Sequence, residues 1–285
     1  MHTESELFFE RYLSQNGYTA YAFEPSIAGQ ESKPDYRIEW QGVSTYHEIK
    51  ELCEKGSRDS KGRWFNPYKS LRKLIGKARS KFGALASSPC TLVVMNVGDW
   101  TALLDPRTIF GAMLGDLGFK MRINTVTGAV EESSFTNAFL GGGKMIAPHT
   151  GDFQNQTISA IVVLKASRFL EPDFGRDLRR LLLDAKWKKG RHLSEREDIE
   201  LRWNFYARYP RGRFTVPRVV VVENPVARKP LPATMFRGPY DERWTVGENG
   251  MACEYEGALL KEQRQIKRDM PIVTRDEPEN DELSA

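Results

Sequence analysis

Three short, almost wholly apolar runs constrain the fold of this 285-residue chain. They are TLVVMNV at 91–97, ISAIVVL at 158–164 and PRVVVVEN at 217–224, and valine and isoleucine dominate them. β-Branched residues favour strands, and a strand that is apolar at successive positions has both of its faces covered. The sequence therefore predicts an α/β protein in which helices flank one central sheet.

The first hundred residues predict a definite order of elements. Apolar residues recur at helical spacing in two segments, and β-branched or aromatic residues with partial alternation mark three others. With the buried run at 91–97, the order is helix, three strands, helix, strand. The expected helices span 4–16 and 68–85, and the expected strands span 18–23, 34–40, 44–52 and 91–97.

The sequence after residue 100 predicts fewer elements of secondary structure. A charged helical stretch at 172–206, which contains the capping box Ser194-x-x-Glu197, separates the two later strands. Residues 101–157 are rich in glycine and polar residues, and 224–244 reads as a proline-punctuated loop. We expect a single enlarged domain, because no repeat or long linker divides the chain. Its expected parts are a core at 1–100, an α/β elaboration at 101–272 continuous with the same sheet, and an acidic disordered tail at 273–285.

Charged residues lie on the second and third expected strands. A hairpin that turns at Gln41-Gly42 would bring Asp35 close to Glu48, and Lys50 shares a strand face with Glu48. Two carboxylates beside a lysine are costly to desolvate, and a hard divalent cation with oxygen ligands is the usual compensation. Such a site suits phosphodiester hydrolysis, because the metal lowers the pKa of a water and stabilises the charge that develops on the phosphate.

The sequence Pro34-Asp35, followed after a spacer by Glu48-x-Lys50, resembles the motif of the PD-(D/E)xK nuclease superfamily. The order of elements in residues 4–97 is similar to the restriction-endonuclease-like fold of that superfamily. The nearest likeness is to archaeal Holliday-junction resolvases and Mrr-type restriction nucleases, and it covers about the first third of the chain. The resemblance implies a mixed central sheet flanked by helices, enlarged here by a C-terminal elaboration.

The resemblance also implies a metal site. Asp35 and Glu48 would bind Mg²⁺, which Mn²⁺ can replace, and the backbone carbonyl of Ile49 would contribute a third oxygen. A glutamate on the first helix completes the site in the resolvases and Mrr-type nucleases. Glu6 occupies the matching place in this chain, and Glu10, one turn further on the same helix face, is its substitute.

Positive charge is concentrated around this expected site. Lys50 would position the attacking water or steady the phosphate, and residues 55–81 hold ten Lys or Arg against the single acid Asp59. The second helix carries lysines at four-residue spacing, and the loop before it adds more cations that can contact phosphates. The expected nucleic-acid contacts are Arg58, Lys61 and Arg63 in the loop and Lys69, Lys73, Lys77 and Lys81 on the helix.

We therefore expect a Mg²⁺-dependent deoxyribonuclease, and we favour a DNA endonuclease of restriction and defence or of repair and recombination. The alternative is a catalytically inactive protein of the same fold that binds nucleic acid or acts as a scaffold. A small-molecule hydrolase is disfavoured, because the later segments show no Ser-His-Asp or Cys-His arrangement with recognisable local geometry. His47 points away from Glu48 and is expected to pack within the sheet.

Composition sets the wider context. The chain is 40% hydrophobic and 28% charged, with a net charge of +4, as is usual for a globular protein. No apolar run reaches the roughly 18 residues that cross a bilayer, and the N-terminal sequence MHTESELFFERYL is acidic, unlike a signal peptide. We expect a cytoplasmic protein whose partner is nucleic acid, DNA first, with a homodimer possible and with neither membrane binding nor a small-molecule cofactor.

Overall fold

The computed structural model describes most of the chain, namely residues 2–27, 33–53, 68–97, 104–123, 130–147, 150–170, 172–208, 213–247 and 250–268. The chain divides into two compact units, one formed by residues 1–167 with 217–258 and the other by 168–216 with 259–285. The expected boundary between core and elaboration, near residue 100, does not coincide with a boundary between these two units. The expected acidic tail at 273–285 lies outside the described residues.

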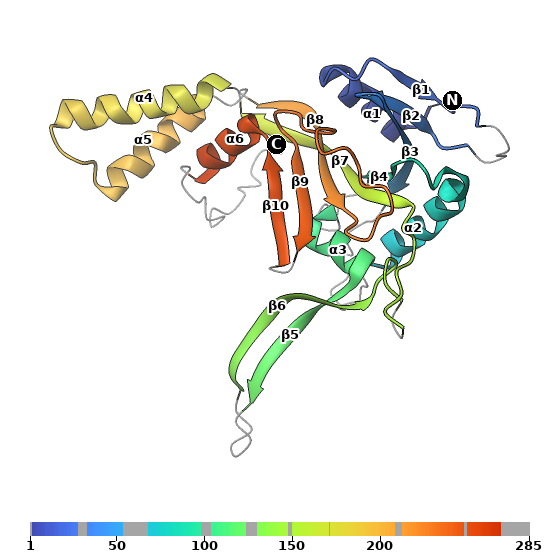
Figure 1. The fold of residues 1–285 in the computed structure, drawn as a ribbon. Helices are drawn as coiled ribbons and strands as arrows, with labels where there is room; N and C mark the ends of the chain where they lie inside the picture. Colours follow the sequence, from blue (N-terminus) through green and yellow to red (C-terminus); the bar gives the residue numbers. More distant parts are fainter. Residues whose placement is uncertain are drawn as a thin grey trace, which may run out of the picture. The chain divides into compact units, whose positions relative to one another are not determined.

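The first unit is built on an eight-stranded mixed sheet with the strand order β1-β2-β3-β4-β7-β8-β9-β10 (Figure 1). Strand β2 is antiparallel to β1 and β3, whereas β3, β4 and β7 run parallel. The predicted α/β class with a mixed sheet is confirmed. The strands are β1 (Tyr21–Phe23), β2 (Tyr36–Trp40), β3 (Val43–Leu52), β4 (Cys90–Asn96), β7 (Ile158–Leu170), β8 (Arg213–Glu223), β9 (Glu242–Gly247) and β10 (Gly250–Glu256).

The predicted order of elements in the first hundred residues is confirmed. Helix α1 (Glu4–Gln15) precedes β1 to β3, and α2 (Lys69–Phe82) joins β3 to β4. Because β3 and β4 are parallel neighbours, α2 is the crossover that returns the chain to the same end of the sheet.

Central strands alternate their side chains between two buried layers. In β4, Leu92 and Val94 pack with residues of α2 and α3 (Pro106–Leu114), whereas Val93 and Met95 pack with residues of α1. The apolar runs that identified these strands are therefore covered on both faces, as predicted. The face under α2 is the one that carries Glu48, since Tyr46 and Leu52 of β3 belong to its core.

The hairpin between β2 and β3 fixes the register of the site. Gln41 and Gly42 have φ angles of +51° and +79°, the left-handed pair that a type I′ turn requires. The resulting register pairs Tyr36 with His47. Asp35 precedes Tyr36 and Glu48 follows His47, so in this antiparallel pair Asp35 lies beside Glu48.

Residues 104–147 contain a helix and two strands that the sequence did not predict. Helix α3 is followed directly by β5 (Gly115–Ile123) and β6 (Val130–Gly142), which pair as a separate antiparallel ribbon (Figure 1). The start of α3 did carry a recognisable signal. Asp105 caps it by accepting a bond from the Thr108 amide at 3.1 Å, and Pro106 occupies its first turn. Strands β9 and β10 were also unforeseen, and β9 begins inside the expected loop at 224–244.

The second unit contains α4 (Pro172–Lys189), α5 (Glu195–Arg208) and most of α6 (Ala258–Arg268). The predicted charged helical stretch is thus two helices, and its capping box is confirmed by bonds from Ser194 N to Glu197 Oε2 at 2.8 Å and from Glu197 N to Ser194 Oγ at 3.4 Å. A small apolar core that includes Leu178 and Phe205 holds α4 to α5. Among the described residues, no helix combines the length and apolar character needed to span a membrane.

Candidate active site

A hydrogen bond from a backbone amide holds Asp35 against β3. It immediately precedes β2, and its Oδ2 accepts a hydrogen bond from the Ile49 amide at 2.7 Å. Its own backbone carbonyl accepts a bond from the Glu24 amide at 2.8 Å. The Ile49 amide therefore directs the carboxylate toward the middle of β3, and the Glu24 amide anchors the backbone of Asp35.

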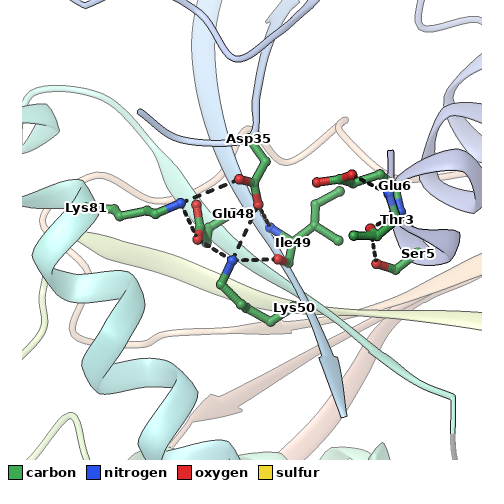
Figure 2. A network of polar contacts seen from close by, with 8 residues as sticks. All are labelled: Thr3, Ser5, Glu6, Asp35, Glu48, Ile49, Lys50 and Lys81. Carbon is green, nitrogen blue, oxygen red and sulfur yellow. Dashed lines mark hydrogen bonds and ion pairs between the residues drawn. The ribbon is translucent and has the colours of Figure 1, made fainter. Parts of the chain in front are cut away.

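Three oxygen atoms converge on the Lys50 ammonium (Figure 2). Lys50 Nζ lies 2.5 Å from Glu48 Oε1, 2.9 Å from the Ile49 carbonyl oxygen and 3.6 Å from Asp35 Oδ2. These are three of the four groups that the resemblance assigned as metal ligands, and the fourth is Glu6. The structure thus places three of the four around one positively charged atom.

A second ammonium reaches the same carboxylates from α2. Lys81 Nζ lies 2.7 Å from Glu48 Oε1 and 3.5 Å from Asp35 Oδ1 (Figure 2). The sequence placed Lys81 among the phosphate contacts, whereas here it pairs with the acidic residues. We call Asp35, Glu48, Lys50 and Lys81 the carboxylate–lysine cluster.

The rest of the lysine row on α2 is exposed. Lys69, Lys73 and Lys77 face solvent, while the opposite side of the helix packs into the core. The predicted contacts Arg58, Lys61 and Arg63 lie outside the described residues. We call Lys69, Lys73 and Lys77 the lysine ridge.

Burial dominates the electrostatics of Glu48. Its side chain is 1% exposed, and Oε2 has no hydrogen-bond partner among the described residues. Burial raises the pKa of Glu48, although the bonds from Lys50 and Lys81 oppose that rise. For Lys81, burial lowers the pKa, but its contacts with Glu48 and Asp35 outweigh burial and leave a net increase. The two lysines therefore favour the ionised form of a carboxylate whose burial favours the neutral form.

The helix glutamates are engaged elsewhere. Glu6 Oε2 accepts a bond from the Thr3 amide at 2.7 Å, completing the capping box of α1, and Figure 2 shows it apart from the two lysines. Glu10 accepts a bond from the Tyr36 hydroxyl at 2.8 Å. Neither glutamate has a described contact with Asp35 or Glu48. Throughout the described ranges, no group of three or more His, Cys, Asp or Glu side chains is arranged to hold a metal ion.

The oxygen donors nevertheless suit a hard cation. Mg²⁺ prefers oxygen ligands, and it commonly binds through one or two carboxylates while keeping several waters. Asp35, Glu48 and the Ile49 carbonyl supply such a set, and the orphaned Glu48 Oε2 is a further buried acceptor. A third carboxylate is not required for this kind of site.

His47 packs within the sheet, as predicted. It is fully buried, with Nε2 2.8 Å from Thr45 Oγ1 and Nδ1 2.5 Å from Thr91 Oγ1. Burial lowers the pKa of His47 to about 3, so the ring is neutral at physiological pH. It therefore has a structural role on the face of β3 opposite Glu48.

Comparison with known proteins identifies no relative: no family model, no curated protein and no solved structure matches the chain. The PD-(D/E)xK likeness therefore stays a resemblance carried by Asp35, Glu48, Lys50 and the order of elements around them. What the chain does has to be inferred from the chemistry of the carboxylate–lysine cluster.

Proposed function

We propose that the protein is a metal-dependent nuclease that hydrolyses phosphodiester bonds, with DNA as the favoured substrate and endonucleolytic cleavage as the favoured mode. The observation that carries this proposal is the convergence of Glu48 Oε1, Asp35 Oδ2 and the Ile49 carbonyl oxygen on one cation within 3.6 Å. Carboxylate and carbonyl oxygens gathered around a point of positive charge form a ligand set suited to Mg²⁺ or Mn²⁺.

Each member of the cluster has a distinct task in this proposal. Asp35 and Glu48 hold the cation, and the amide of Ile49 keeps Asp35 oriented. A bound Mg²⁺ would supply an activated water and would withdraw charge from the phosphate. Lys50 and Lys81 carry positive charge at the same place, where they can contact a phosphate oxygen as negative charge develops on it.

The surroundings of the cluster favour a nucleic acid over a small phosphodiester. The lysine ridge lies on α2, the helix that also delivers Lys81. A row of exposed cations on one helix can follow a phosphate backbone without reading its sequence. Restriction and defence, or repair and recombination, are the cellular settings that we favour for such an activity.

One observation favours the alternative of an inactive nucleic-acid-binding or scaffold protein. Lys50 and Lys81 already neutralise both carboxylates, so the buried charge is compensated without a metal. In that case the protein would bind DNA equally well in EDTA and in Mg²⁺, and no cleavage product would form.

A cleavage assay distinguishes the two. Purified protein is incubated with supercoiled, linear, branched and single-stranded DNA in Mg²⁺, in Mn²⁺ and in EDTA, alongside Lys50→Ala and the control Glu39→Gln. Glu39 is an exposed acid on β2 that pairs with Arg37 outside the cluster. The proposal predicts metal-dependent cleavage that Glu39→Gln retains and that Lys50→Ala lowers by about 10²-fold or more. DNA binding without any cleavage in either metal would select the scaffold alternative.

A further inference from the structure

A concave site lies in the first unit, and none of its described lining residues belongs to the carboxylate–lysine cluster. It is a hollow of about 430 Å³, which falls within the usual size of small-molecule sites, about 300–1,000 Å³. The lining comes from three places in the sequence: the end of α2, the segment before β7 and the loop after β8. Its residues are Arg79, Gly83, Phe153, Gln154, Asn155, Gln156, Thr157 and Arg228.

Hydrogen bonds fix the walls of this hollow. The Gln154 amide donates to the Met145 carbonyl at 2.7 Å, which anchors the segment before β7. Arg228 is tied to the same segment twice, because its amide donates to the Gln156 carbonyl at 2.9 Å and its Nε donates to Gln156 Oε1 at 3.0 Å. The site is therefore formed in advance, with little ordering left for a ligand to impose.

Two buried polar atoms in the lining lack partners. Asn155 Oδ1 and Thr157 Oγ1 make no hydrogen bond with any described residue, and Asn155 is only 9% exposed. The orientation of the Asn155 amide is determined, because its Nδ2 donates to the Lys144 carbonyl and a flipped amide would place oxygen against oxygen. An unpaired buried acceptor is unfavourable, so a ligand donor that reaches Asn155 Oδ1 would stabilise the site.

The charge and shape of the lining indicate the chemistry of the ligand. Among the described residues that line the hollow are two arginines and no acidic residue. Guanidinium groups bind phosphates through paired N–H donors. Phe153 is 59% exposed at the rim and offers a flat face on which a base can stack. Asparagine and glutamine side chains are well suited to pair with the edge of a base.

We propose that this hollow is a nucleotide-binding site. Arg79 and Arg228 bind the phosphate. Phe153 stacks on the base, and the side chains of Asn155 and Thr157 form hydrogen bonds with the edge of the base. The nucleotide comes either free from solution or as one unit of a nucleic-acid strand. Both sources present the same chemistry to the site.

The position of the hollow suggests how a strand would reach it. Arg79 and Lys81 are two residues apart on α2, about 200° around the helix, so they leave it on opposite flanks. An α-helix with its side chains is about 10–12 Å wide. A nucleic-acid strand that crosses α2 could therefore place one nucleotide in the hollow and a phosphate at the carboxylate–lysine cluster. The exposed Lys73 and Lys77 lie on the same helix. This extension rests on the proposed nuclease function, whereas nucleotide binding by the hollow does not.

Calorimetric titration in EDTA tests the proposal without involving a metal site. The ligands are the four deoxynucleoside monophosphates, a short single-stranded oligonucleotide and ribose 5-phosphate. The variants are Arg79→Ala and Phe153→Ala, both at exposed positions, with exposed Arg107→Ala on α3 as the control. We expect each variant to weaken nucleotide binding about tenfold or more, and the control to bind like the wild type.

The titrations distinguish a free nucleotide from a nucleotide within a strand. Monophosphate binding that depends on Arg79 and Phe153 supports a free nucleotide as ligand, and oligonucleotide binding alone with the same dependence supports a nucleotide within a strand. Ribose 5-phosphate binding as tightly as the monophosphates, variants that bind like the wild type, or no binding at all would overturn the proposal. Asp35→Asn should bind nucleotides normally, so a failure of the nuclease proposal would leave this result unaffected.

Discussion

At the scale of single residues, Glu48 is the centre of the carboxylate–lysine cluster. Its carboxylate is almost fully buried, and two ammonium groups approach the same oxygen while the other oxygen has no described hydrogen-bond partner. Burial of a carboxylate is unfavourable unless charge compensates it. Lys50 and Lys81 give that compensation in the structure, and in the proposed nuclease they would also contact the phosphate.

Removing Lys81 tests how far Glu48 depends on it. We expect Lys81→Met to lower the free energy of unfolding by about 1–3 kcal/mol, because a buried carboxylate loses one of its two counter-charges. The exposed Lys77→Met on the same helix is the control and should change stability by no more than about 0.5 kcal/mol. Urea denaturation measures both. Equal and small effects of the two substitutions would show that Lys81 is not needed to compensate Glu48.

At the scale of elements, the turn at Gln41-Gly42 sets the register that brings Asp35 beside Glu48. Gly42→Val forces a β-branched residue into left-handed backbone, which costs about 1–3 kcal/mol, whereas Gly42→Asn should cost less because asparagine tolerates that conformation. We expect the valine variant to lose both thermal stability and cleavage, and the asparagine variant to keep most of each. A valine variant as stable and active as the asparagine variant would show that this turn does not control the site.

The α4–α5 turn gives a pH-dependent prediction. Hydrogen bonds from Arg191 and Lys189, with further bonds from Ser194, hold the pKa of Glu197 well below its ordinary value. Because the pKa is depressed in the folded state, Glu197 stabilises the turn above the ordinary glutamate pKa of about 4.3, and this contribution is lost as pH falls further. Hydrogen exchange at the start of α5 should therefore accelerate below about pH 4 in the wild type. Glu197→Gln should show fast exchange with little pH dependence beyond the intrinsic rate, and an unchanged profile would contradict the assignment.

Local sequence patterns predicted much of the site and little of its surroundings. Alternation within strands and the hairpin turn were sufficient to predict that Asp35, Glu48 and Lys50 share one edge, because register and facing are local properties. The place of Lys81 was not predictable, since the rotation of α2 over the sheet depends on which residues enter the core. The engagement of Glu6 did have a local signal that was missed, because Thr3-x-x-Glu6 is a capping-box pattern, and the box competes for the carboxylate.

At the scale of the whole molecule, every residue proposed to act lies in the first unit, and α2 connects them. It supplies Lys81 to the cluster, Arg79 to the hollow and the lysine ridge to the surface. The hollow could not be predicted from sequence, because its lining joins segments that are at least seventy residues apart and share no motif. Folding alone brings them together.

The lysine ridge predicts a salt-dependent mode of DNA binding. Lys73→Ala combined with Lys77→Ala should lower the slope of log affinity against log salt by about two units, because each phosphate contact contributes about one. Preference among DNA sequences should change little, since phosphate contacts carry no sequence information. A double control at exposed arginines, Arg11→Ala with Arg107→Ala, should leave the slope unchanged. Fluorescence anisotropy at several salt concentrations measures it, and an unaltered slope in the lysine variant would reduce the ridge to a solvated helix face.

We propose that Asp35, Glu48 and the Ile49 carbonyl form a metal site whose three oxygens also contact the Lys50 ammonium. Calorimetric titration of Mn²⁺ into the wild type, Asp35→Asn and Lys50→Ala measures this site without requiring cleavage. Asparagine can still accept the hydrogen bond from the Ile49 amide, so Asp35→Asn should remain folded. It should lose Mn²⁺ binding, because the substitution removes the negative charge of the ligand. Lys50→Ala should bind Mn²⁺ at least as tightly as the wild type, because its ammonium no longer competes for the three oxygens. Mn²⁺ binding of equal strength in the wild type and Asp35→Asn would show that Asp35 is not a metal ligand.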